Sequence, residues 1–164
     1  IGISSGQMVT GNMGSEARMN YTMMGDNVNT AARLESSAKQ YGIYIQIADS
    51  TYQPVKDKVV VRDLDNVRVM GKNEPVKVWE LISEKGKEPE LYKKILPAYH
   101  EALDLYKNQE WSKAIEAFKA SDELEDMFPG RKTNPSRIYI PRCEHFLANP
   151  PGEDWDGVWT LTSK

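Results

Sequence analysis

The stretch YTMMGDNVNTAARLE, residues 21–35, decides how the first half of the chain is expected to fold. A Gly-Asp pair opens the helical part, and small apolar residues follow at helical spacing: Val28, Ala31, Ala32 and Leu34. Asn29 and Arg33 are four positions apart, so in a helix they share one side. The pattern predicts a helix over residues 26–40 with an amide and a guanidinium side by side.

Signals at both ends set the limits of this helix. Asp26 or Asn27 can cap its start, because a short polar side chain accepts a hydrogen bond from a free backbone amide there. Gly42 ends the helix, because glycine readily adopts the left-handed conformation that closes many helices. For Asp26 we expect this capping role rather than a chemical one.

Short strands and helices alternate through residues 1–83, a pattern of α/β or α+β folds, and α+β is the fold class we predict. Two strands are expected at 1–4 and 7–10, followed by a polar connector at 14–21. The remaining expected elements are strands at 43–48, 59–64, 66–71 and 76–82, a short helix within 49–57, and a turn at 71–75.

The pattern changes after residue 83. Residues 84–90 form a charged linker, and the apolar spacing beyond it predicts helices at 91–108, 111–124 and 134–147. The spacing of small and large residues resembles a tetratricopeptide repeat, so residues 91–148 are expected to form a small all-α extension. Residues 149–164, rich in Pro, Gly and Trp, are expected to be an extended tail.

Two roles are open for this helical extension. It either shields one side of the first domain or forms a one-repeat interaction element. Because single repeats are rarely stable alone, we expect it to dock on its own first domain or on that of a second copy. Trp155 and Trp159 either cap the extension or bind a partner, and burial of these aromatics is the expected outcome.

Composition narrows the function classes. The net charge of −3 over 164 residues gives no broad electrostatic case for nucleic acid or an anionic membrane. No apolar run approaches the roughly 20 residues that span a bilayer. His100, His145 and Cys143 cannot make a zinc site alone, and a single cysteine excludes an internal disulfide. We expect both histidines to be surface or packing residues and Cys143 to be a structural thiol.

The first residues, IGISSGQMV, read like the interior of a strand and carry no initiating Met. The chain is therefore expected to be a piece of a longer protein. Within it, Asn29 and Arg33 could face a nucleotide, because a guanidinium binds phosphates and an amide can orient a ribose or base. The alternative is an ordinary surface helix with an exposed Asn and Arg.

A long resemblance supports the nucleotide interpretation. GISSGQMVTGNMGSEARMNYTMMGDNVNTAARLESSAKQYG, residues 2–42, closely resembles the second half of the class III adenylate/guanylate cyclase catalytic domain, and RDLDNVRVMGKNEPVKVWEL, residues 62–81, continues the match. The resemblance implies a partial ferredoxin-like domain of bacterial type with a mixed or antiparallel sheet. It also implies conversion of ATP to cyclic AMP and pyrophosphate, two Mg or Mn ions, and active sites formed between the two domains of a homodimer.

The resemblance also implies roles for individual residues. Arg33 matches the family's transition-state arginine, Asn29 the asparagine that orients the ribose, and Thr22 the base-selecting position. At that position a hydroxyl points to ATP, although it could also donate to a guanine carbonyl. Arg18 lies in a connector that is near the dimer interface in relatives, so it is either a contact residue or a solvated charge.

Two departures from the family pattern matter. The metal-binding aspartates, and the lysine that reads the base with Thr22, belong to the part of the domain that precedes Ile1. This chain alone is therefore expected to be inactive and to bind metal poorly. Relatives often have a phosphate-binding lysine where Met70 stands, and Lys72 is either its substitute or an ordinary turn residue.

Two function classes follow. The first is part of an adenylate cyclase, expected in the cytoplasm or, where an upstream segment anchors the protein, on the cytoplasmic side of a membrane. The second is a non-catalytic cyclase-like scaffold that dimerises or senses nucleotides, with the helical extension binding a partner. Asn29, Arg33 and Thr22 favour catalysis, whereas Met70 favours the scaffold.

Overall fold

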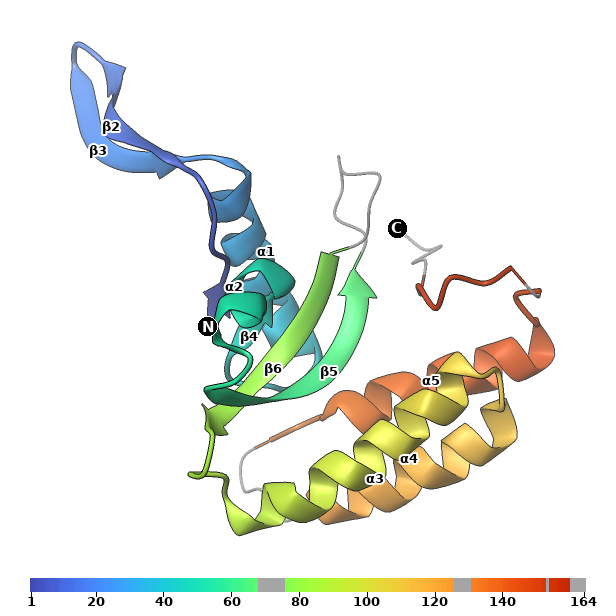
Figure 1. Ribbon diagram of the computed structural model, residues 1–164. Coiled ribbons are helices and arrows are strands. Elements are labelled where there is room, and N and C mark those ends of the chain that lie inside the picture. The colour runs from blue at the N-terminus through green and yellow to red at the C-terminus, as the bar shows by residue number, and fades with distance from the viewer. Residues whose placement is uncertain (68–75, 126–130, 153, 160–164) are drawn as a thin grey trace.

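The computed structural model describes residues 1–67, 76–125, 131–152 and 154–159, and it joins a small mixed sheet to a set of three long helices (Figure 1). The sheet has the strand order β1-β4-β6-β5, with β1 at Gly2–Ile3, β4 at Gln46–Ala48, β5 at Val59–Val67 and β6 at Val76–Glu84. β1 is parallel to β4, while β6 is antiparallel to both β4 and β5. The α+β prediction is therefore confirmed.

Helix α1, Asp26–Gln40, packs its apolar side on this sheet, as the spacing of its small apolar residues requires. Leu34 and Ala38 join Tyr41, Leu64 and Val78 in a buried cluster. The expected short helix is present as α2, Asp49–Tyr52, and the 3₁₀ turn η1, Gln53–Val55, which accommodates Pro54. Ala48 stands at the cap position of α2 and offers no side-chain cap.

The first strands differ from the sequence prediction. β2, Val9–Ser15, and β3, Arg18–Met24, form a separate antiparallel hairpin that projects from the body (Figure 1). The strand expected at 7–10 is longer, and the polar connector expected at 14–21 was wrong. A strand exposed on both faces needs no alternation of apolar and polar residues, so its polar, glycine-containing sequence hid it.

The expected strands at 59–64 and 66–71 are also different. Residues 59–67 form the single strand β5, in which register shifts at Val60/Val61 and Asp63/Asp65 mark irregularities. Irregular pairing of this kind bends a strand without ending it, and the polar residues around Asp65 suggested an end that does not exist. The expected turn at 71–75, with Lys72, and Met70 before it lie outside the described residues.

The C-terminal end of α1 closes on glycine, as predicted. Gly42 has a φ of +66°, and its amide and that of Ile43 donate to the carbonyls of Lys39 and Ala38. A Cβ built on Gly42 would lie 2.0 Å from the Thr133 carbonyl oxygen, so the segment before the last helix touches this turn directly.

Gly42→Ala is expected to lower the free energy of unfolding by about 1–3 kcal/mol, because alanine is strained at positive φ and clashes with Thr133. Gly86→Ala is the matched control, since Gly86 also has positive φ but faces open space. Urea unfolding of both variants checks this. Equal losses of unfolding free energy in the two variants would show that the clash with Thr133 adds nothing to the effect of positive φ.

Three helices follow at the predicted places: α3 at Glu90–Lys107, α4 at Trp111–Glu125 and α5 at Pro135–Ala148. They enclose an aromatic cluster whose fully buried or nearly buried members are Tyr99, Tyr106, Trp111, Phe118, Tyr139 and Phe146. Trp155 and Trp159 pack against it and are partly buried, so the expected burial is met in part. Cys143 is buried here, and burial raises the pKa of its thiol to about 12, as suits a structural thiol.

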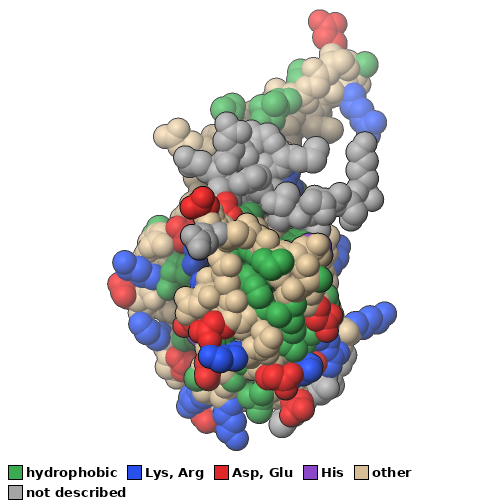
Figure 2. All heavy atoms as spheres, turned by 90° about the vertical axis from the view of Figure 1, so that its right-hand side faces the viewer, with side chains coloured by type: hydrophobic (Ala, Val, Ile, Leu, Met, Phe, Trp, Pro, Cys, Tyr) green, Lys and Arg blue, Asp and Glu red, His purple; other side chains and the backbone are tan. Residues whose placement is uncertain are grey.

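The helices lie against β5 (Figure 1). The Tyr139 hydroxyl donates to the Leu64 carbonyl, and the Asp63 amide donates to His100 Nε2 at 3.4 Å. Acidic and basic side chains are interspersed on the face shown in Figure 2. Among the described residues, no helix has both the length and the apolar character that crossing a membrane requires.

His100 predicts a pH effect on stability. Burial lowers the pKa of its imidazole below 6.5 although Asp63 opposes this, and protonation would remove the acceptor for the Asp63 amide. The unfolded chain then binds a proton at a pH where the folded chain does not, so the free energy of unfolding falls as the pH drops below 6.5. Urea unfolding from pH 7.5 to 5 is expected to show a weaker decline in His100→Gln; identical declines would contradict this.

Candidate functional site

The exposed side of α1 carries the two residues that the sequence singled out. Thr30, Leu34 and Ala38 are buried at four-residue intervals. Asn29 directly precedes Thr30, and Arg33 directly precedes Leu34. Both Asn29 and Arg33 are exposed. The predicted arrangement, an amide and a guanidinium accessible on one side of the helix, is therefore present.

The start of α1 is anchored differently from the prediction. Gly25, with a φ of +148°, is the cap residue, and Asp26 lies in the first turn, so the expected capping by the side chain of Asp26 or Asn27 is not found. Instead Asn27 Nδ2 donates to the Gln7 carbonyl at 3.2 Å, and its Oδ1 accepts from the Ser4 hydroxyl at 3.2 Å. Asn27 thus ties the loop before β2 to the helix.

Thr22 lies on the projecting hairpin rather than on the helix. It is exposed on β3, opposite Gly11 of β2, and β3 runs into Gly25 and α1. The structure therefore places Thr22 on the segment that leads directly to the helix with Asn29 and Arg33. Arg18 begins the same strand and is exposed.

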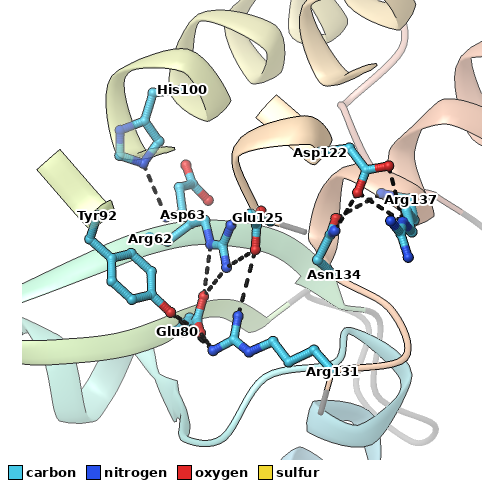
Figure 3. Close-up of polar contacts among 10 residues, drawn as sticks. All are labelled: Arg62, Asp63, Glu80, Tyr92, His100, Asp122, Glu125, Arg131, Asn134 and Arg137. Carbon is cyan, nitrogen blue, oxygen red and sulfur yellow. Dashed lines mark hydrogen bonds and ion pairs between the residues drawn. The ribbon is translucent and has the colours of Figure 1, made fainter. Parts of the chain in front are cut away.

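A buried charge cluster, which was not predicted from the sequence, joins the sheet to the helices (Figure 3). Arg62 of β5 is fully buried; its Nε donates to Glu80 of β6 at 2.7 Å and its Nη1 to Glu125 of α4 at 2.5 Å. Arg131 Nη2 lies 3.4 Å from Glu80 and donates to the Tyr92 hydroxyl of α3 at 3.0 Å. These four charged residues and Tyr92 connect two strands, two helices and the segment before α5.

The opposite charges of this cluster face one another, which keeps the Arg62 guanidinium charged. Burial alone would lower the pKa of Arg62, but Glu80 and Glu125 outweigh it and raise the pKa. Burial raises the pKa of Glu125, and Arg62 opposes that rise. An Arg within the strand sequence VVVRDL gave no sign of burial, because its partner Glu125 is far away in the chain.

The residues that the structure describes do not fit the two metal ions of the cyclase family. In the described part of the chain, no three His, Cys, Asp or Glu side chains come together in a way that could hold a metal ion. The acidic residues of the buried cluster are already bound to arginines. No metal-dependent step is therefore derived from these residues.

The family follows from comparison with known proteins. Residues 1–83 match the model of the adenylate and guanylate cyclase catalytic domain, and the chain belongs to this family.

Its relatives include two adenylate cyclases. The chain is 37% identical over 147 residues to the terminal-differentiation-specific adenylate cyclase of Dictyostelium discoideum, covering 87% of this chain and 7% of that protein. It is 35% identical over 81 residues to adenylate cyclase 1 of Rhizobium meliloti, covering 49% of this chain and 12% of that protein. The chain thus spans only a small part of these relatives.

Among solved structures, the adenylyl cyclase CyaB of P. aeruginosa is 32% identical, with a TM-score of 0.42 over 50% of this chain and 41% of that one. The match to the Dictyostelium protein also covers helices of the extension. A match that covers 87% of the chain extends beyond residues 1–83, so it includes part of the helical segment. That relative therefore resembles this chain beyond the cyclase domain.

Proposed function

We propose that this chain is part of an adenylate cyclase that converts ATP to cyclic AMP and pyrophosphate. The observation that carries the proposal is the pair Asn29 and Arg33, exposed on one side of α1 in a chain of the cyclase family. The identity of the chain to adenylate cyclases of two distant organisms supports ATP as the substrate.

The proposed roles follow from the chemistry of the side chains. Arg33 stabilises the charge that develops on the reacting phosphate, because its guanidinium donates several hydrogen bonds and stays charged. Asn29 holds the ribose so that its 3′-oxygen faces the α-phosphate. Thr22, on the hairpin that leads into α1, accepts a hydrogen bond from the adenine amino group.

We further propose that a second catalytic domain covers the hairpin in a homodimer. Large apolar side chains are exposed on and beside it: Met8, Val9, Met19, Tyr21, Met23 and Met24. Apolar patches of this kind are typical of surfaces that another polypeptide covers. We also propose that the Mg or Mn ligands come from outside this chain, which alone would be inactive.

The division of the chain is proposed on the same basis. Residues 1–83 are the cyclase part, 84–90 a linker, 91–148 the helical extension and 149–164 the tail. The extension docks on its own cyclase part through the buried cluster around Arg62.

A second candidate is a non-catalytic, cyclase-like scaffold. Met70 favours it, because the sequence pattern of relatives often has a phosphate-binding lysine there. If catalysis is retained, Lys72 is proposed to contact the terminal phosphates.

A cyclase assay of the full-length protein that contains this chain separates the two candidates. ATP and GTP are supplied in parallel with manganese, and the products are identified by chromatography. Cyclic AMP from ATP, with little cyclic GMP, is the expected result. No cyclic product from either nucleotide in a folded dimer would support the scaffold.

A further inference from the structure

We propose that helix α5 of the extension holds the C-terminal end of α1 and thereby positions Asn29 and Arg33, with Arg142 as the positioning residue. This inference rests on the proposed cyclase function for its catalytic consequence, whereas the contact between the helices does not depend on it.

A buried polar triad makes the connection. Tyr41, the residue that ends α1, donates from its hydroxyl to Asp65 Oδ2 of β5 at 2.5 Å. Arg142 of α5 donates from Nη1 to the same oxygen at 2.6 Å, and its Nη2 lies 3.4 Å from the Tyr41 hydroxyl. The Arg142 and Asp65 side chains are 12% and 6% exposed, so water does not compete effectively with this pair.

The pKa shifts of Tyr41 and Arg142 keep both side chains hydrogen-bond donors around neutral pH. Burial and the charge of Asp65 raise the pKa of Tyr41, so its hydroxyl stays protonated and remains a donor. Burial lowers the pKa of Arg142, but Asp65 outweighs this and raises it, so the guanidinium stays charged.

Two further contacts strengthen the same junction, one between apolar side chains and one through the backbone. Ile138, one turn before Arg142 in α5, packs against the cluster that contains Leu34, Ala38 and Tyr41. The Thr133 carbonyl, just before α5, lies against Gly42 so closely that a Cβ there would be 2.0 Å away. The extension thus touches the last turn of α1 through a side-chain triad, an apolar contact and the backbone.

Asn29 lies in the N-terminal half of the same helix, and Arg33 lies at its middle. An α-helix of 15 residues is stiff and about 22 Å long, so a tilt at its C-terminal end displaces its N-terminal half. In a positioned active site a displacement of about 1 Å can reduce the rate about 100-fold. Arg142 therefore acts on the nucleotide through α1 without touching it.

The test uses the full-length protein with the variants Arg142→Met, Arg142→Lys and Arg137→Met. Arg137 is the matched control: it lies on the same helix, but its Nε donates to Asp122 of α4 at 2.8 Å, within the extension. We expect Arg142→Met to lower kcat about 10- to 100-fold with little change in KM for ATP. Arg142→Lys restores part of kcat, and Arg137→Met changes neither constant.

Hydrogen–deuterium exchange of the α1 amides provides a readout besides activity. Exchange in α1 is expected to accelerate in Arg142→Met and not in Arg137→Met. Wild-type kcat and wild-type α1 exchange in a folded Arg142→Met variant would overturn the proposal. Should that variant unfold, Tyr41→Phe, which removes only the hydroxyl, decides by the same two readouts. If the wild-type protein forms no cyclic nucleotide, the proposed function fails, and the exchange experiment still decides whether α5 holds α1.

Discussion

Replacing Arg33 with Ala in the full-length protein is expected to lower kcat for cyclic AMP formation by about 10²- to 10³-fold, the usual cost of removing one donor that stabilises transition-state charge. KM for ATP should change much less, because the contact is strongest when charge develops on the phosphate. Initial rates at saturating and limiting ATP separate the two constants.

Lys39→Ala is the matched control for this experiment. Lys39 is an exposed cation on the same helix, but it forms an ion pair with Glu35 at 2.9 Å and lies in the last turn. Its replacement should leave kcat unchanged. An Arg33→Ala variant that keeps wild-type kcat, or a Lys39→Ala variant that loses as much, would remove the specific role of Arg33.

Arg62→Met is expected to lower the free energy of unfolding by about 3–5 kcal/mol, because it leaves the buried carboxylates of Glu80 and Glu125 without their main partner. Urea unfolding followed by circular dichroism measures the loss. Adding Glu125→Gln to Arg62→Met should recover part of it, since one unpaired buried charge is then removed.

The control for the buried cluster is again Arg137→Met. The Arg137 and Asp122 side chains are 36% and 21% exposed, so water can solvate the carboxylate that remains, and the loss should be much smaller. A loss in Arg62→Met no larger than in this control would mean that the cluster does not fasten the helices to the sheet.

Local sequence patterns predicted most of the secondary structure. The limits of α1 and the three helices after residue 90 could be predicted because their apolar spacing is long and regular. The hairpin of β2 and β3 could not, since its two exposed faces carry no alternating pattern. The continuity of β5 was hidden by its irregular register at Asp63/Asp65.

The candidate site, like the fold, could be predicted from the sequence only in part. The shared side of Asn29 and Arg33 follows from a four-residue spacing, and the structure has both exposed on α1. Their roles toward a nucleotide remain predictions from family resemblance. The junctions Arg62–Glu125 and Arg142–Asp65 could not be predicted, because each joins residues more than 60 positions apart.

The most direct test of the account is a crystal structure of the complete catalytic dimer with an ATP analogue that lacks the 3′-hydroxyl and cannot cyclise. We expect the Arg33 guanidinium within hydrogen-bonding distance of a phosphate oxygen and the Asn29 amide at the ribose. A bound nucleotide that contacts neither side chain, with both still facing solvent, would contradict the assignment of this side of α1 to catalysis.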